Sequence, residues 1–109
     1  MLDYNAVTSP YPAVMFKIVG DSVSGRIIGV EPYQETGVKI HLETSPGDDA
    51  SRVTLWCEGA KLTQAVESAF RAANVSCLAV GDDLAVRFTG YEGRPKVYDT
   101  VYRVHVSRI

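Results

Sequence analysis

Residues 52–89, RVTLWCEGAKLTQAVESAFRAANVSCLAVGDDLAVRFT, contain the changes of periodicity that decide the fold. In the first six of these residues apolar and other side chains alternate, which predicts a strand with one buried face. Apolar residues then recur at helical spacing over 62–73, which predicts an amphipathic helix, and Asn74 suits its left-handed end. Over 84–88 the period returns to two, so the helix connects two strands.

Three further strands are predicted outside this stretch. The first runs from about residue 16 to residue 31, and its three glycines favour bulges in a strongly coiled strand. Its alternation slips near Ile28, as a bulge would make it. Another strand covers 38–43, and the last covers 97–106 after a hairpin loop at 90–96. The order is therefore three strands, one helix and two strands.

This order is that of an OB-fold, so we expect an all-β fold with one helix. The expected architecture is a five-stranded OB-fold barrel with the helix between strands three and four. Residues 1–15 lack periodicity and are expected to form an N-terminal arm. The OB-fold domain then covers 16–109, and a length of 109 residues favours a single domain.

The composition is that of a soluble globular protein, with 46% hydrophobic and 22% charged residues. No apolar run approaches the roughly 20 residues of a membrane span, and the N-terminus does not resemble a secretory signal. We therefore expect a cytoplasmic protein with no membrane partner. Cys57 and Cys77 both lie in apolar surroundings, which predicts reduced, buried thiols.

The charge is distributed unevenly along the chain. The formal net charge of −2 argues mildly against strong general affinity for phosphate backbones. Residues 86–109, however, carry five basic and two acidic side chains, a net charge of +3, whereas residues 1–85 carry −5. Positive charge is thus concentrated in the predicted C-terminal hairpin.

Trp56 is the strongest candidate binding residue. The alternation places it on the polar face of the third strand, where an exposed indole can stack on a base. The alternative is that Trp56 packs under the N-terminal arm or in an interface between copies of the chain. Arg52 and Lys39 share this face and could contact phosphates, although each could equally be an ordinary solvated charge. Glu43 lies on the same face and weakens a phosphate track.

Two predicted loops carry further candidates. Tyr33 lies in the loop between the first two strands, and Tyr91, Arg94 and Lys96 lie in the loop between the last two. In OB-folds these loops flank the binding cleft. Aromatic and basic residues together suit single-stranded nucleic acid, because each base offers a π-face and each linkage a charge. The alternative is a polar hairpin with one tyrosine packed back on the barrel.

No catalytic, metal or cofactor site is predicted. His41 and His105 have no nearby nucleophile in an elbow pattern. The glycine-rich stretches match neither a phosphate loop nor a dinucleotide fingerprint, and the cysteines and histidines lack zinc-ligand spacing. We therefore expect a protein that is not an enzyme and needs neither a metal nor a cofactor.

Five short motifs carry a family resemblance: GDSVSGRI (20–27), TLWC (54–57), GDDL (81–84), TG (89–90) and VYRV (101–104). With these motifs the chain resembles the small OB-fold single-stranded DNA-binding proteins, and most of all those encoded by phages of actinobacteria. The resemblance implies binding of single-stranded DNA with little sequence preference, in phage DNA replication or recombination in the host cytoplasm. Small single-strand binding domains often assemble, so a homo-oligomer is compatible with it.

A rival function from another class stays open. An OB-fold can dock a peptide or another subunit on the same face, because the fold alone does not fix the function. The net negative charge and Glu43 favour such a protein-interaction module. Stacking on aromatic rings serves DNA and RNA alike, so the sequence does not separate the two.

Overall fold

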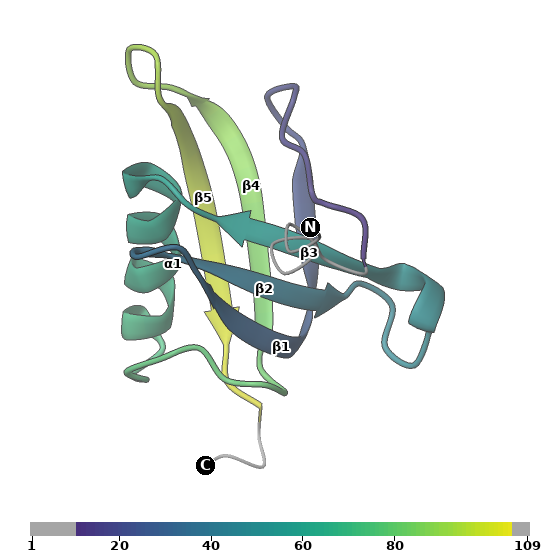
Figure 1. Cartoon of the computed structure of the whole chain (residues 1–109). Helices are drawn as coiled ribbons and strands as arrows, with labels where there is room; N and C mark the ends of the chain where they lie inside the picture. The colour runs from purple at the N-terminus through teal and green to yellow at the C-terminus, as the bar shows by residue number, and fades with distance from the viewer. Residues whose placement is uncertain (1–10, 106–109) are drawn as a thin grey trace.

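The computed structural model describes residues 11–105 and shows a mostly-β protein with one α-helix in this range (Figure 1). The elements in chain order are β1 (Ser22–Tyr33), β2 (Gly37–Glu43), a short 3-10 helix (Asp49–Ser51), β3 (Arg52–Cys57), α1 (Ala60–Ala72), β4 (Asp83–Tyr91) and β5 (Lys96–Arg103). The helix α1 is not long and apolar enough to cross a membrane, and no other helix between residues 11 and 105 is.

The five strands form one antiparallel sheet in the order β3-β2-β1-β4-β5. Within residues 11–105 the edge strands β3 and β5 do not pair, so the sheet is open and the expected closed barrel is not formed. Other segments occupy both edges. Pro12 and Val14 hydrogen-bond to Thr54 of β3, and Thr100 of β5 donates its hydroxyl to the Ala65 carbonyl of α1.

Strand β1 belongs to both halves of the sheet. Its first part, from Ser22 to Arg26, pairs with β4, and its second part, from Arg26 to Tyr33, pairs with β2. A bulge between Ile27 and Gly29 shifts the register, which confirms the slip that the sequence predicts near Ile28. The strand therefore turns a corner, and Figure 1 shows β1 curving from behind the sheet to its front.

One hydrophobic core lies between the inner sheet face and α1. The helix contributes Leu62, Val66 and Ala69, the positions that its periodicity predicts. The fully buried apolar side chains of the strands are Ile27, Ile40, Leu42, Leu55, Cys57, Leu84, Val86 and Phe88. Burial of Cys57 agrees with the sequence, but Cys77 is exposed, so that prediction is wrong for the second thiol.

The start of the first strand also differs from the prediction. Residues 18–21 form a turn, and the Asp21 carboxylate accepts the backbone N–H groups of Lys17 and Ile18. This local hydrogen bonding competes with strand formation, and β1 begins only at Ser22.

The C-terminal end of α1 agrees with the prediction. Asn74, just after the helix, adopts a φ of 65°, which confirms the predicted left-handed stop.

Candidate functional site

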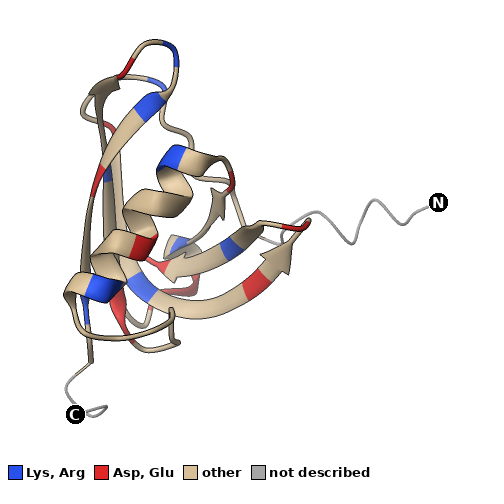
Figure 2. Cartoon of the chain, turned by 90° about the vertical axis from the view of Figure 1, so that its left-hand side faces the viewer, with Lys and Arg blue, Asp and Glu red and all other residues tan. Residues whose placement is uncertain are grey.

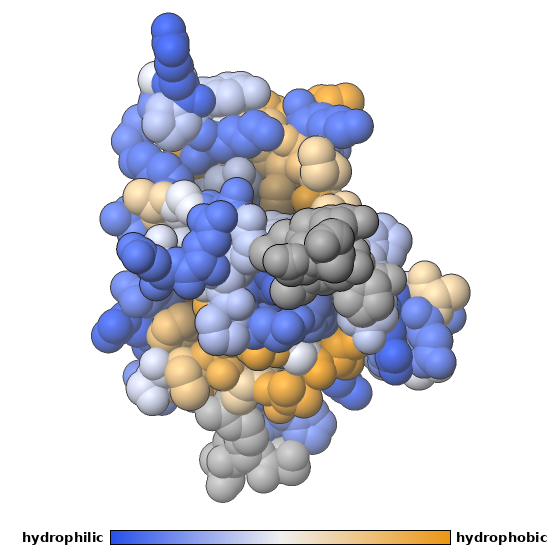
Figure 3. All heavy atoms as spheres, viewed as in Figure 1, coloured by the Kyte–Doolittle hydropathy of each residue, from blue (hydrophilic) through white to orange (hydrophobic). Residues whose placement is uncertain are grey.

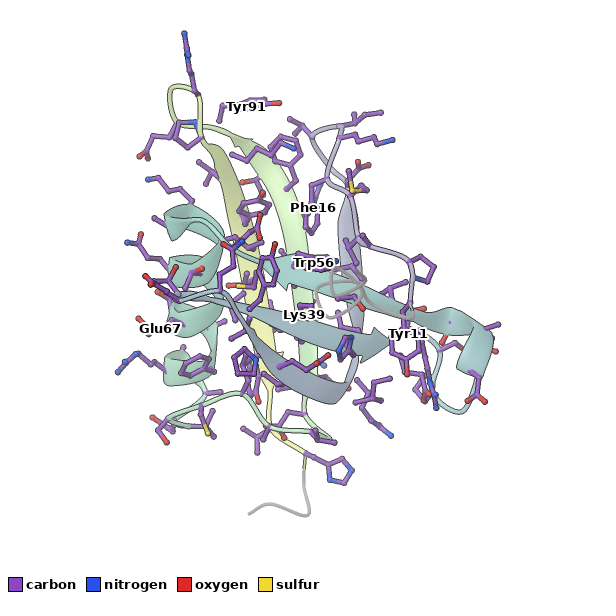
Figure 4. The ribbon with its side chains drawn as sticks, viewed as in Figure 1. Tyr11, Phe16, Lys39, Trp56, Glu67 and Tyr91 are labelled. Carbon is purple, nitrogen blue, oxygen red and sulfur yellow. The ribbon has the colours of Figure 1, made fainter. Side chains whose placement is uncertain are left out.

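The outer face of β2 and β3 brings three predicted binding residues together. Successive rows across the two strands pair Lys39 with Trp56, His41 with Thr54, and Glu43 with Arg52. These six side chains share a face because residues two apart on a strand point the same way. The face is turned to the viewer in Figures 1, 3 and 4, and its surface mixes hydrophilic and apolar groups (Figure 3).

Trp56 and Tyr33 form an aromatic pair. Its indole is half-buried, and the Tyr33 ring packs edge-on against it with a centroid separation of 4.8 Å and an interplanar angle of 88°. Tyr33 is the last residue of β1, and its contact with Trp56 holds the turn between β1 and β2 against β3. The structure thus joins two residues that the sequence places on separate elements.

Lys39 does not present its charge to solvent. Only 4% of the residue is exposed, and its ammonium lies 5.2 Å from the centre of the Trp56 indole and 4.0 Å from Glu31 Oε1. A cation over an indole face is attracted by the ring quadrupole. Lys39 therefore supports the indole, and the alternative that it is an ordinary solvated charge is wrong.

Arg52 is held by two carboxylates. Its Nε lies 3.1 Å from Glu43 and its terminal nitrogen Nη2 2.9 Å from Asp49. The hydrogen bond with Glu43 raises the pKa of Arg52. The Gly47 N–H, and then Arg52, lower the pKa of Glu43. The two carboxylates neutralise much of the Arg52 charge, which weakens its attraction for a phosphate.

A hydrogen-bonded relay that the sequence does not reveal crosses the same face. His41 Nδ1 lies 2.8 Å from the Thr54 hydroxyl, and His41 Nε2 lies 2.5 Å from Glu31. The hydrogen bond with His41 lowers the pKa of Glu31. A hydroxyl, an imidazole and a carboxylate in this order resemble a nucleophile with its base. Thr54 is fully buried, however, so the relay ties β1, β2 and β3 together instead of meeting a substrate.

The N-terminal segment runs from β3 toward the β4–β5 hairpin. Thr54 donates its N–H to the Pro12 carbonyl and accepts the N–H of Val14. Further along, the Phe16 carbonyl accepts a hydrogen bond from Lys96 Nζ, and Phe16 itself is buried. Residues 12–16 are therefore part of the folded domain. The remainder of the predicted arm, residues 1–10, lies outside the described residues.

The hairpin loop carries the most exposed of the candidates. Tyr91 is 59% exposed, with its ring edge-on to Phe88 at 5.3 Å. Figure 4 shows Tyr91 toward the end of the hairpin, apart from Trp56. Arg94 is exposed, and no residue between 11 and 105 forms an ion pair with it. Lys96 turns inward instead, with its ammonium 5.2 Å from the Phe88 ring centre.

The predicted cations thus divide into one free group and three engaged ones. Arg94 faces solvent, whereas Lys39, Arg52 and Lys96 already contact a carboxylate or a carbonyl. In the view of Figure 2, acidic and basic residues are interspersed along the described part of the ribbon. The site is an aromatic surface with little free positive charge.

The comparisons with known proteins add no relative. No family model matches the chain, and neither a curated protein nor a solved structure matches it. The chemistry of the site is therefore argued from its geometry.

Proposed function

We propose that the chain is an OB-fold protein that binds single-stranded nucleic acid, DNA by preference, with little selection for sequence. The order β3-β2-β1-β4-β5, with α1 following β3, is that of an OB-fold opened between its third and fifth strands. Small OB-fold barrels are commonly only partly closed. The open sheet is therefore compatible with this fold.

The observation that carries the proposal is the aromatic pair of Trp56 and Tyr33. It lies on the face of strands two and three, beside the loop between strands one and two, where OB-folds bind oligonucleotides. Stacking on an aromatic ring contributes about 1–3 kcal/mol per base and tolerates any base. Tyr91, at the end of β4 beside the β4–β5 loop, offers a second ring.

The charges favour a stacking mechanism with few phosphate contacts. Arg94 is the ready phosphate ligand, and Arg52, Lys39 and Lys96 contribute only by exchanging their internal partners. The logarithm of the affinity should therefore fall with the logarithm of the salt concentration with a shallow slope, about −0.7 for each phosphate that is neutralised. Such a protein would protect single strands during replication or recombination, as the resemblance to phage proteins implies.

A protein-interaction module is the second candidate, and the paired charges favour it. Lys39, His41 and Glu43 are each less than 10% exposed, and a backbone segment already adds to the edge of β3 at Thr54. An extended peptide could pair with the rest of that edge. The net charge of −2 also favours this candidate over a phosphate-binding surface.

Trp56 is the chain's only tryptophan, so its fluorescence reports directly on the proposed site. We would titrate oligo-dT and oligo-rU into the protein at low and at moderate salt. Saturable quenching that weakens with salt supports the proposal, and the stronger of the two curves identifies the preferred nucleic acid. An unchanged signal, with neither oligonucleotide retarded in a gel-shift assay, overturns it in favour of the protein-interaction module.

A further inference from the structure

A second open surface lies on another part of the outer sheet face, formed by the outward side chains of β1, β4 and β5. Figure 2 shows the β4–β5 hairpin nearly edge-on along the left of the molecule, with α1 on its inner side. The register of the three strands arranges the outward side chains of this face in three rows. The rows are Ser22-Arg87-Asp99, Ser24-Ala85-Val101 and Arg26-Asp83-Arg103.

The central row is small and apolar. Ser24 and Ala85 have short side chains, and Val101 is 49% exposed. Shallow hollows of about 380 and 330 Å³ flank Val101, one toward each outer row. The surface thus allows close approach of another sheet and leaves room for its side chains.

Most charges of the outer rows have no ion-pair partner among the described residues. Among residues 11–105, no ion pair within 4.0 Å engages Arg87, Asp99 or Arg103. Asp83 lies 3.8 Å from Arg26 Nε, and that nitrogen has no hydrogen-bond partner among the described residues. Arg87, Asp99 and Arg103 are therefore available to a partner, and the half-exposed Asp83 carboxylate can meet a second cation beside Arg26.

The pattern of these charges is complementary to itself. A two-fold axis along the central row, perpendicular to the strands, lays each strand over its own copy in the opposite direction. Arg87 then faces the partner's Asp83, and Asp99 faces the partner's Arg103, with each pair formed twice. An axis parallel to the strands would instead set Asp83 against the partner's Asp83, which is repulsive.

We propose that the chain forms a homodimer through this face, about the two-fold axis along the central row. The three rows cover roughly 15 by 15 Å. This is less than the about 800 Å² that each partner buries in a stable complex. The dimer is therefore weak, dependent on concentration and sensitive to salt. It leaves the β2–β3 face of both copies open, and it does not depend on whether that face binds nucleic acid.

Two charge reversals test the pairing of Asp99 with the partner's Arg103. Sedimentation across micromolar to near-millimolar concentrations should show dimerisation of the wild-type protein. Asp99→Arg and Arg103→Asp should each raise the dissociation constant more than about tenfold, because like charges then meet across the axis. An equimolar mixture of the two variants should dimerise again, because each introduced charge faces its opposite. Native mass spectrometry identifies the mixed dimer.

The control is Arg71→Asp, the same reversal on an exposed arginine of α1, which should dimerise like wild type. Val101→Lys should prevent dimerisation by placing two ammonium groups at the axis, whereas Val80→Lys, at another exposed valine outside the face, should not. Circular dichroism verifies that each variant is folded. A wild-type protein that stays monomeric throughout, a dimer that tolerates the reversals, or folded variants that fail to restore the dimer on mixing overturns the proposal.

Discussion

Lys39 and Trp56 are cross-strand partners on β2 and β3, with the ammonium 5.2 Å from the centre of the indole. Because Lys39 is almost fully buried and lies close to Glu31, its charge is compensated inside the protein. The ammonium of Lys39 therefore supports the indole ring and adds little free charge for a phosphate. We expect base stacking on Trp56 to be the main contribution of this face to nucleic-acid binding.

Replacing Trp56 with alanine should weaken binding of oligo-dT by about 5- to 150-fold, the equivalent of one stacked base. Trp56→Phe keeps an aromatic ring and should retain most of the affinity. Anisotropy of a labelled oligonucleotide measures both variants without the tryptophan signal. Since Trp56 is half-buried, thermal unfolding must verify that both variants are folded. Unchanged affinity of a folded Trp56→Ala variant would place the bound strand elsewhere.

Arg94 is expected to contact a phosphate, because it is exposed and unpaired among the described residues. Arg94→Ala should reduce the slope of log affinity against log salt by about 0.7, the value for one phosphate of a single strand. Arg71→Ala removes another exposed arginine, which is paired with Glu67 on α1, and should leave the slope unchanged. Equal slopes for all three proteins would exclude Arg94 as a phosphate ligand.

Much of the fold follows from side-chain periodicity. The helix predicted over 62–73 is α1 at Ala60–Ala72, and the strand predicted over 38–43 is β2 at Gly37–Glu43. The helix buries Leu62 and Val66, whose spacing defines its apolar face. Periodicity succeeds here because burial of one face decides the conformation.

The partners of the site residues could not be predicted in the same way. Alternation places Lys39 and Trp56 on one face, but it gives neither the pairing of strands nor the depth of a side chain. The relay of His41 with Thr54 and Glu31 depends on the registers of β1, β2 and β3, which are long-range properties. Attachment of residues 12–14 to β3 uses backbone groups alone and leaves no pattern in the sequence.

Tyr102 should stabilise the fold through a buried hydrogen-bond network. Its hydroxyl lies 2.5 Å from Asp82 Oδ2 and accepts the Ala79 N–H at 3.0 Å, while Asp82 is fully buried. Tyr102→Phe leaves these buried groups without that partner and should lower the free energy of unfolding by about 1–3 kcal/mol. Tyr98→Phe is the matched control, because no residue between 11 and 105 hydrogen-bonds to its hydroxyl. Urea denaturation measures the free energy of unfolding of both variants. An equal decrease for Tyr102→Phe and Tyr98→Phe would contradict a stabilising role of the network.

The Glu43 carboxylate should make stability depend on pH. The Gly47 N–H and Arg52 lower its folded pKa below the ordinary value of 4.5. A lowered folded pKa gives stability that is present above the unfolded value and is lost as the pH falls through the folded value. Thermal unfolding from pH 7 to about pH 3 should therefore show a smaller decline for Glu43→Gln than for wild type. Glu67→Gln, on the exposed side of α1, should follow the wild-type curve.

Gly25 is required where β1 passes closest to β2. A Cβ atom at this position would lie 2.7 Å from the Glu43 carbonyl oxygen and 3.1 Å from Thr44 Cα, both of them backbone atoms. Backbone cannot yield as a side-chain tip does, so Gly25→Ala should force the strands apart and cost about 1–3 kcal/mol of the free energy of unfolding. Ser24→Ala, at the exposed neighbour, should change it by less than about 0.5 kcal/mol. Equal stability of the two variants in urea would show that the corner of β1 tolerates a side chain.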